Sequence, residues 1–189
     1  MADRTGRLRG PWVAGVGLAT AVMLIVAAAW WTTHPKAFLD SPNYEAAAAL
    51  PTEGMHAIAF AVIDPGVGRH GTVTFRQITA NVVQNDAGAG VHLSVCRLDP
   101  ERLDGSVIGA IDVADLSDYC RTLEPVRGAT FDLDAASARQ SQIVLTITPT
   151  RPGVVKVNGV RVSYRQGLRF GEQTTGPHLT VTSNEPGSR

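Results

Sequence analysis

Regularly spaced carboxylates are the first residues in this chain that could do chemistry. Asp112, Asp115 and Asp118 recur every three residues. Further acids stand upstream, at Asp99, Glu101 and Asp104. Oxygen-rich clusters of this kind hold calcium in many proteins, but the 12-residue pattern of an EF-hand is missing. Asp115 or Ser117 equally suits the cap of a helical turn, so calcium stays an alternative and we predict no metal site.

Catalytic motifs are missing from the sequence. It contains no Gly-x-Ser-x-Gly, His-Glu-x-x-His or P-loop pattern. Its histidines in the β-rich region are scattered, at His56, His70, His92 and His178. A triad assembles such residues only through the fold, and nothing in the sequence favours one. We therefore predict no catalytic residue, no cofactor and no enzymatic activity.

The two cysteines, Cys96 and Cys120, are predicted to form a disulfide. They are the only cysteines in the chain, and both follow an apolar segment that we expect to cross a membrane. Two thiols in one small exported domain are typically paired. A reactive thiol pair or a metal site is the alternative, but there is no Cys-x-x-Cys spacing or neighbouring histidine to favour it.

A glycine-rich stretch near the C-terminus is the best candidate for an interaction loop. Gly167, Gly171 and Gly176 punctuate residues 164–177, a spacing that favours tight turns between strands. The side chains that could recognise a partner there are Arg165, Arg169, Phe170, Glu172 and Gln173. The alternative is a structural crossover in which Arg165 or Arg169 pairs with Glu172.

The same region carries a family resemblance. Residues 149–153 read Pro-Thr-Arg-Pro-Gly, residues 157–164 read Val-Asn-Gly-Val-Arg-Val-Ser-Tyr, and Gly167, Gly171, Gln173 and Gly176 follow. This order resembles uncharacterised single-pass membrane proteins of actinobacteria, in which such an ending follows an immunoglobulin-like domain. The resemblance covers the last 50 or so residues and implies a cell-envelope protein, with no activity attached.

Residues 11–33 are predicted to form one transmembrane helix. No charged residue lies between Arg9 and Lys36, and about 20 apolar residues suffice to cross the hydrocarbon layer. Arg4, Arg7 and Arg9 precede the segment, so residues 1–10 should be cytoplasmic and the rest extracytoplasmic. Cleavage after Ala29, as in a secretory signal, is the alternative.

Alternating apolar residues predict an all-β domain at 55–184, after a stalk at 34–54 with one helical turn near Ala46–Leu50. A polar tail closes the chain at 185–189. The alternation slips near Gln77–Ile78, which indicates a bulge or a strand that changes sheets. Asn158-Gly159 suits a type I′ turn, so a hairpin is expected that pairs Val155 with Val162 and Val157 with Val160.

Seven to nine short strands favour an all-β sandwich, which the resemblance implies is immunoglobulin-like, with a partly open β-barrel as the alternative. Residues 37–189 carry 13 basic and 16 acidic residues, a balance that does not favour nucleic-acid binding.

We expect the cell membrane and an envelope protein to be the partners. A small-ligand or metal-binding sensor is the second hypothesis and an envelope enzyme the third. A pocket converging on His92, Asp112 or Asp118 would favour the second, and an exposed aromatic patch near Phe170 the first.

Overall fold

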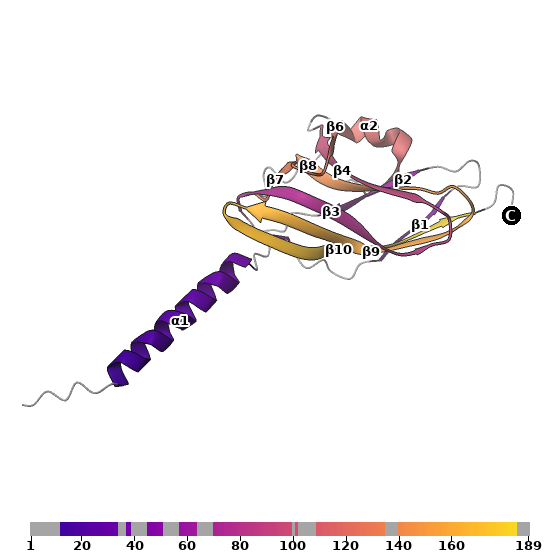
Figure 1. Cartoon of the computed structure of the whole chain (residues 1–189). Helices are drawn as coiled ribbons and strands as arrows, with labels where there is room; N and C mark the ends of the chain where they lie inside the picture. Colours follow the sequence, from indigo (N-terminus) through magenta and orange to yellow (C-terminus); the bar gives the residue numbers. More distant parts are fainter. Residues whose placement is uncertain are drawn as a thin grey trace, which may run out of the picture.

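Two β-sheets packed against each other make up most of the molecule (Figure 1). The computed structural model describes residues 12–33, 37–38, 45–50, 57–63, 70–99, 101, 109–134 and 140–184. In chain order the elements are α1 (Trp12–Thr33), β1 (Glu45–Leu50), β2 (Ile58–Ile63), β3 (Thr72–Asn85), β4 (Gly90–Leu98), β5 (Ala110–Asp112), the 3₁₀ turn η1 (Val113–Asp115), α2 (Leu116–Tyr119), β6 (Cys120–Pro125), β7 (Thr130–Asp132), β8 (Ser141–Thr148), β9 (Gly153–Gln166) and β10 (Arg169–Ser183).

The sheets have the strand orders β1-β10-β9-β3-β7 and β5-β2-β8-β4-β6. Neighbouring strands are antiparallel except β1, which runs parallel to β10. Ile143, Leu145 and Ile147 of β8 are fully buried in the core between the sheets, as their alternation predicts. The prediction of a mostly β, two-layered domain is confirmed.

Strand β9 replaces the hairpin that was expected at Asn158-Gly159, and that prediction is wrong. β9 runs unbroken through both residues, with β10 on one side and β3 on the other. Its buried side chains change phase at this point, from Val155 and Val157 to Val160 and Val162. A bulge in one continuous strand therefore places buried residues symmetrically on either side of Asn158-Gly159, as a hairpin turn would. Gly159 supplies the positive φ of 69° that such a bulge uses.

The phase slip predicted in the preceding long strand is confirmed as a bulge in β3. The register of β3 against β9 shifts between Phe75 and Gln77, which leaves Arg76 as the additional residue. Phe75 is buried in the core, whereas Ile78 and Ala80 after the bulge are only partly covered. The core-facing side chains of β3 are therefore fully buried up to the bulge and only partly buried after it.

The disulfide between Cys96 and Cys120 is present, as predicted, with the two Cα atoms 5.3 Å apart. It joins the neighbouring strands β4 and β6 within one sheet. Both cysteines are buried with Leu98, Leu116 and Val144 in a second apolar cluster. The helical segment α2 covers this cluster from the outer face of the sheet (Figure 1). The short strand β5 precedes η1 and α2, and residues 102–108 lie outside the described part.

Residues expected to form a stalk belong to the domain where the structure describes them. Glu45–Leu50 is a strand and not a helical turn, because pairing with the edge of β10 outweighs the helical preference of alanine. Ala37 and Phe38 are buried, and Phe38 packs against the rings of Phe75 and Tyr164, at centroid distances of 6.0 and 5.2 Å. The chain therefore enters the core four residues after the end of α1.

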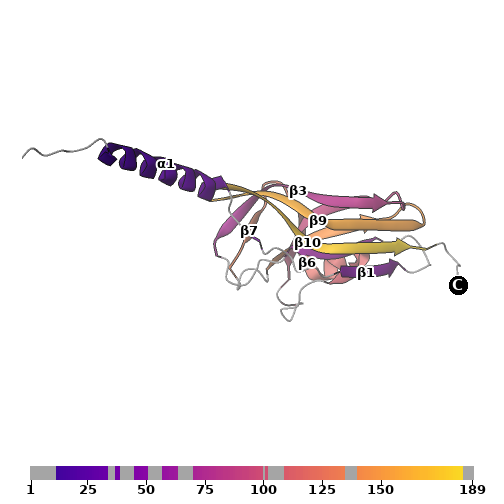
Figure 2. The same ribbon diagram turned by 90° about the horizontal axis from the view of Figure 1, so that it is seen from below.

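Helix α1 projects away from the sandwich, and its C-terminal end lies beside the end of β9 and β10 (Figure 2). It has no acidic residue in its first turn and no basic residue in its last. Side chains are described for Thr20–Trp30 of this helix. Within the described residues, no helix is long and apolar enough to cross a membrane.

Candidate functional site

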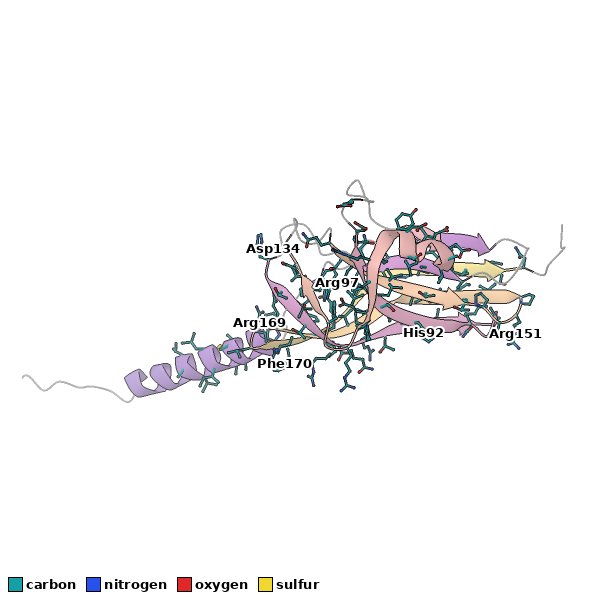
Figure 3. The ribbon with its side chains drawn as sticks, turned by 90° about the horizontal axis from the view of Figure 1, so that it is seen from above. His92, Arg97, Asp134, Arg151, Arg169 and Phe170 are labelled. Carbon is teal, nitrogen blue, oxygen red and sulfur yellow. A yellow bond between two sulfur atoms is a disulfide. The ribbon has the colours of Figure 1, made fainter. Side chains whose placement is uncertain are left out.

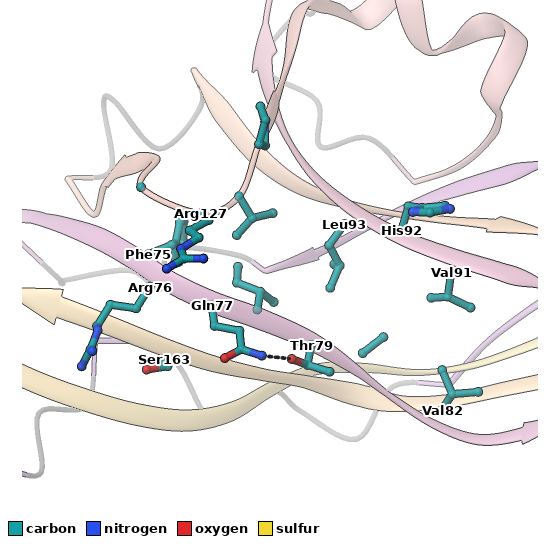
Figure 4. Close-up of a pocket in the computed structure, with 15 residues that line it drawn as sticks. Phe75, Arg76, Gln77, Thr79, Val82, Val91, His92, Leu93, Arg127 and Ser163 are labelled. Atoms are coloured by element: carbon teal, nitrogen blue, oxygen red, sulfur yellow. Dashed lines mark hydrogen bonds between the residues drawn. The ribbon is translucent and has the colours of Figure 1, made fainter.

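A groove of about 1050 Å³ opens between the strands β3 and β4, on the side where the two sheets separate (Figure 4). The turn between β6 and β7 closes its end beside Phe75. The groove exists because β3 leaves the core at its bulge. Its lining residues include Arg76, Gln77, Ile78, Leu93, His92 and Arg127.

The floor of the groove is apolar. Ile78 and Ala80 come from β3, and Val91 and Leu93 come from β4. All four are partly covered and pack against the main core, so they cannot move far. The groove therefore offers a fixed surface on which apolar side chains of a ligand could be buried.

The rim of the groove is polar, with a positive bias. Arg76 and Arg127 stand on it as exposed side chains, and no acidic residue occurs among the described residues that line it. Gln77 donates a hydrogen bond from Nε2 to Thr79 Oγ1 at 3.3 Å along the edge of β3 (Figure 4). Two guanidinium groups without a carboxylate partner in the groove favour ligands that carry carboxylates.

One edge of β3 beside the groove has no partner strand in the described part of the molecule. β7 pairs only with Thr72–Thr74. Phe75 then exchanges backbone hydrogen bonds with the β6–β7 turn, N to Ala129 O and O to Gly128 N, both at 2.9 Å. From Arg76 to Asn85, β9 is the only strand that pairs with β3 among the described residues. Backbone donors and acceptors on the other edge are therefore available to an added strand.

The five residues expected in an interaction loop lie instead on two paired strands, and Figure 3 labels two of them, Arg169 and Phe170. Arg165 is the penultimate residue of β9. The other four, Arg169, Phe170, Glu172 and Gln173, lie in the first part of β10, across the two-residue turn Gly167-Leu168. Glu172 forms an ion pair with Arg161, from Nε to Oε1 at 3.4 Å, whereas the alternative reading of the sequence paired Glu172 with Arg165 or Arg169.

Two of these five residues have roles that the sequence did not indicate. Gln173 anchors the chain that follows α1: its Nε2 donates to Phe38 O at 2.7 Å, and its Oε1 accepts from Phe38 N at 3.2 Å. The ring of Phe170 lies 5.4 Å from the guanidinium carbon of Arg76 and is 52% exposed. Gln173 is thus a structural residue, whereas Phe170 stays available for recognition.

The acids and histidines singled out from the sequence do not come together. Asp112 caps the turn η1, accepting from Ala114 N at 2.8 Å, and lies apart from the groove that His92 lines. His70 bonds Asp134 at 2.7 Å on the surface, while His56 and Asp104 lie outside the described residues. Across the part of the chain that the structure describes, no group of three or more His, Cys, Asp or Glu side chains is placed to hold a metal ion.

Sequence reasoning missed the groove, although a signal for it was present. The phase slip at Gln77–Ile78 locates the bulge in β3, but only the fold shows that β4 diverges there. Residues 66–71 match the spacing Gly-x-Gly-x-x-Gly, but the strand β3 follows them where a dinucleotide site needs a helix.

Comparison with known proteins supplies no identity for the domain. No protein-family model and no curated protein sequence matches this chain. The features of the molecule that bear on its function are the groove, the edge of β3 beside it and the apolar N-terminal segment.

Proposed function

We propose that this chain is a membrane-anchored, extracytoplasmic protein-interaction module of the cell envelope, and that its β domain binds an extended segment of a partner protein. The observation that carries the proposal is the groove beside the unpaired edge of β3. An added strand could satisfy the backbone of that edge and place every second side chain over Ile78, Ala80 and Leu93. Arg76 and Arg127 favour a partner segment that also carries carboxylates.

The anchor in this proposal is α1. Its support comes from the sequence, in which the segment between Arg9 and Lys36 is uncharged and the arginines stand on the N-terminal side. The disulfide between Cys96 and Cys120 suits an oxidising compartment outside the cytoplasm. An immunoglobulin-like sandwich and a relationship to single-pass actinobacterial membrane proteins belong to the same proposal, and both rest on the resemblance of the C-terminal residues.

Replacing Met23 with arginine tests the anchor. Met23 is exposed near the middle of α1, and arginine at the centre of a transmembrane helix disfavours insertion by about 2.5–3.5 kcal/mol. Met23→Arg should move the protein from the membrane fraction to the soluble one, while Met23→Leu should leave it in place. An equal distribution of the two variants would contradict anchoring through α1.

Site-specific photocrosslinking in intact cells tests the groove. A photoreactive residue at Thr79, on the β3 edge, should capture a partner that the same residue at exposed Ala110 does not. Ala80→Trp, which fills the groove, should abolish that crosslink, and Ala110→Trp should preserve it. A crosslink at Thr79 that survives Ala80→Trp would contradict binding in the groove.

A small-ligand sensor is the second candidate, because the groove has the volume of a ligand pocket and includes His92. Asp112 and Asp118, which the sequence hypothesis placed with His92, do not line it. If Ala80→Trp left every protein crosslink intact and altered only the binding of small molecules, this second function would replace the first.

A further inference from the structure

We infer that the closed end of the β9–β10 hairpin is a second contact with the membrane, in which Leu168 enters the lipid headgroup region beside α1 and neighbouring arginines bind lipid phosphates. This inference rests on the anchoring that is part of the proposed function. It assigns to the hairpin end a lipid partner, whereas the groove binds protein. The hairpin end is defined here as Arg76, Arg165, Leu168 and Phe170.

Exposed apolar side chains mark the hairpin end. Leu168 is 94% exposed at the two-residue turn and Phe170 is 52% exposed beside it. Single exposed apolar residues are common, but an aliphatic and an aromatic side chain at the end of a rigid hairpin form a projection. Gly167 holds the turn with a φ of 61°, so Leu168 is presented by a defined backbone geometry.

Two exposed arginines lie beside this projection. The guanidinium carbon of Arg76 lies 5.4 Å from the centroid of the Phe170 ring, and Arg165, exposed on β9, is paired with Phe170 across the two strands. Arg169, which begins β10, is half-buried, and its Nε is buried. Guanidinium groups bind phosphates in a bidentate manner, and an aromatic ring beside them is typical of the membrane–water interface. Of the described acids at this end of the sandwich, Glu172 pairs with Arg161, Asp134 bonds His70, and Asp132 accepts a hydrogen bond from the Asp134 backbone amide. This combination fits a lipid headgroup layer better than a purely apolar partner.

The position of the hairpin end relative to α1 makes the contact geometrically reasonable. Only residues 34–36 separate Thr33 from Ala37, and the Ala37 amide donates to Tyr164 Oη of β9 at 2.9 Å. β9 runs from Tyr164 toward the C-terminal end of α1 and ends at Gln166 (Figure 2). Leu168 follows in the turn, four residues after Tyr164 and at most about 14 Å away along the chain. The views agree in placing this end beside the C-terminal end of α1 (Figures 1, 2 and 3).

A fluorescence experiment on the full chain in pure lipid vesicles tests this contact. Because both native cysteines form the disulfide, Leu168→Cys introduces a single free thiol for an environment-sensitive dye. Val83→Cys is the matched control, since Val83 is 59% exposed near the far end of β3 and outside the groove lining. Vesicles would carry quenchers on their lipids, and flotation would show that the protein is bound.

At position 168 we expect at least twofold stronger quenching than at position 83, and Arg165→Gln should weaken it. Vesicle-bound protein with equal quenching at both positions would overturn the hairpin contact and leave the anchor intact. Protein that does not float with vesicles would overturn the anchor, and the hairpin contact with it. No protein partner is present, so quenching at position 168 can arise only from lipid.

Discussion

At the residue scale, Gly159 and Gly167 share a left-handed backbone but differ in their surroundings. Their φ angles are 69° and 61°. A Cβ at Gly159 would lie 2.7 Å from Thr175 O, whereas a Cβ at Gly167 would meet nothing within 4 Å. The bulge in β9 therefore requires glycine for two reasons, and the hairpin turn for only one.

Alanine substitution should separate these two reasons. Gly167→Ala should lower the free energy of unfolding by about 1–2 kcal/mol, the cost of the left-handed backbone. Gly159→Ala should cost more, about 3 kcal/mol or beyond, because β9 and β10 must also move apart. Chemical denaturation of both variants measures the difference. Equal losses would mean that the bulge relaxes easily and that the close approach to Thr175 is unimportant.

A second residue-scale prediction concerns Glu124 and pH. The hydrogen bond from Arg97 lowers the pKa of Glu124 below its ordinary value of 4.5, with Arg97 Nη2 only 2.9 Å from Oε2. The folded pKa is thus below the unfolded one. The pair therefore contributes its full stabilisation above pH 4.5, and this contribution is lost as the pH falls through the folded pKa.

The variant Glu124→Gln measures that contribution. It should be less stable than the native chain at pH 7, and the difference should shrink steadily below pH 4.5. Thermal unfolding across this range, with Thr122→Val as a control for the minor partner, gives the comparison. A stability difference that is the same at pH 7 and pH 3 would show that the ion pair does not stabilise the fold.

At the scale of elements, alternation predicted the strands but not all of their partners. The pattern in residues 155–164 could not distinguish a hairpin from a bulged strand, because both reverse the buried face at Asn158-Gly159. The strand at Glu45–Leu50 was missed because four alanines carry no β signal, and its formation depends on the edge of β10. The groove likewise depends on the separation of β3 and β4, which is a tertiary property.

The disulfide-linked segment is the element whose contribution to stability is easiest to measure. The bond between Cys96 and Cys120 closes a loop of about 25 residues, which corresponds to about 3.5 kcal/mol in the chain-entropy model. Replacing both cysteines with serine should lower the free energy of unfolding by roughly that amount. Because Leu116 packs on the bond, α2 should also exchange its amide hydrogens faster.

Hydrogen exchange of the double variant shows which elements lose stability when the disulfide is removed. Faster exchange confined to α2 and β6 would agree with a local clamp on the outer face of the sheet. Equal acceleration in β9 and β10 would instead mean that the bond supports the main core, contrary to the separation of the two apolar clusters.

At the scale of the whole molecule, the short connection between α1 and the sandwich determines what the domain can do. A flexible stalk would let the groove sample many orientations above a membrane. Here Phe38 is fully buried and Gln173 bonds its backbone on both sides, so the domain is coupled to the helix. Such coupling would keep the hairpin end toward the bilayer and the β3 edge at a fixed orientation for a partner.

Tyr164→Phe tests this coupling with the smallest available change. The ring stays in place against Phe38, while the buried Ala37 amide loses its acceptor at a cost of about 1–3 kcal/mol. Tyr119→Phe, at a half-buried ring in α2, is the control. If the connection orients the domain, Tyr164→Phe should reduce lipid quenching of a dye at position 168 while the protein remains fully bound to vesicles. Unchanged quenching together with the expected loss of stability would assign Tyr164 to the core alone, and the orientation of the domain would then depend on Gln173 and Phe38.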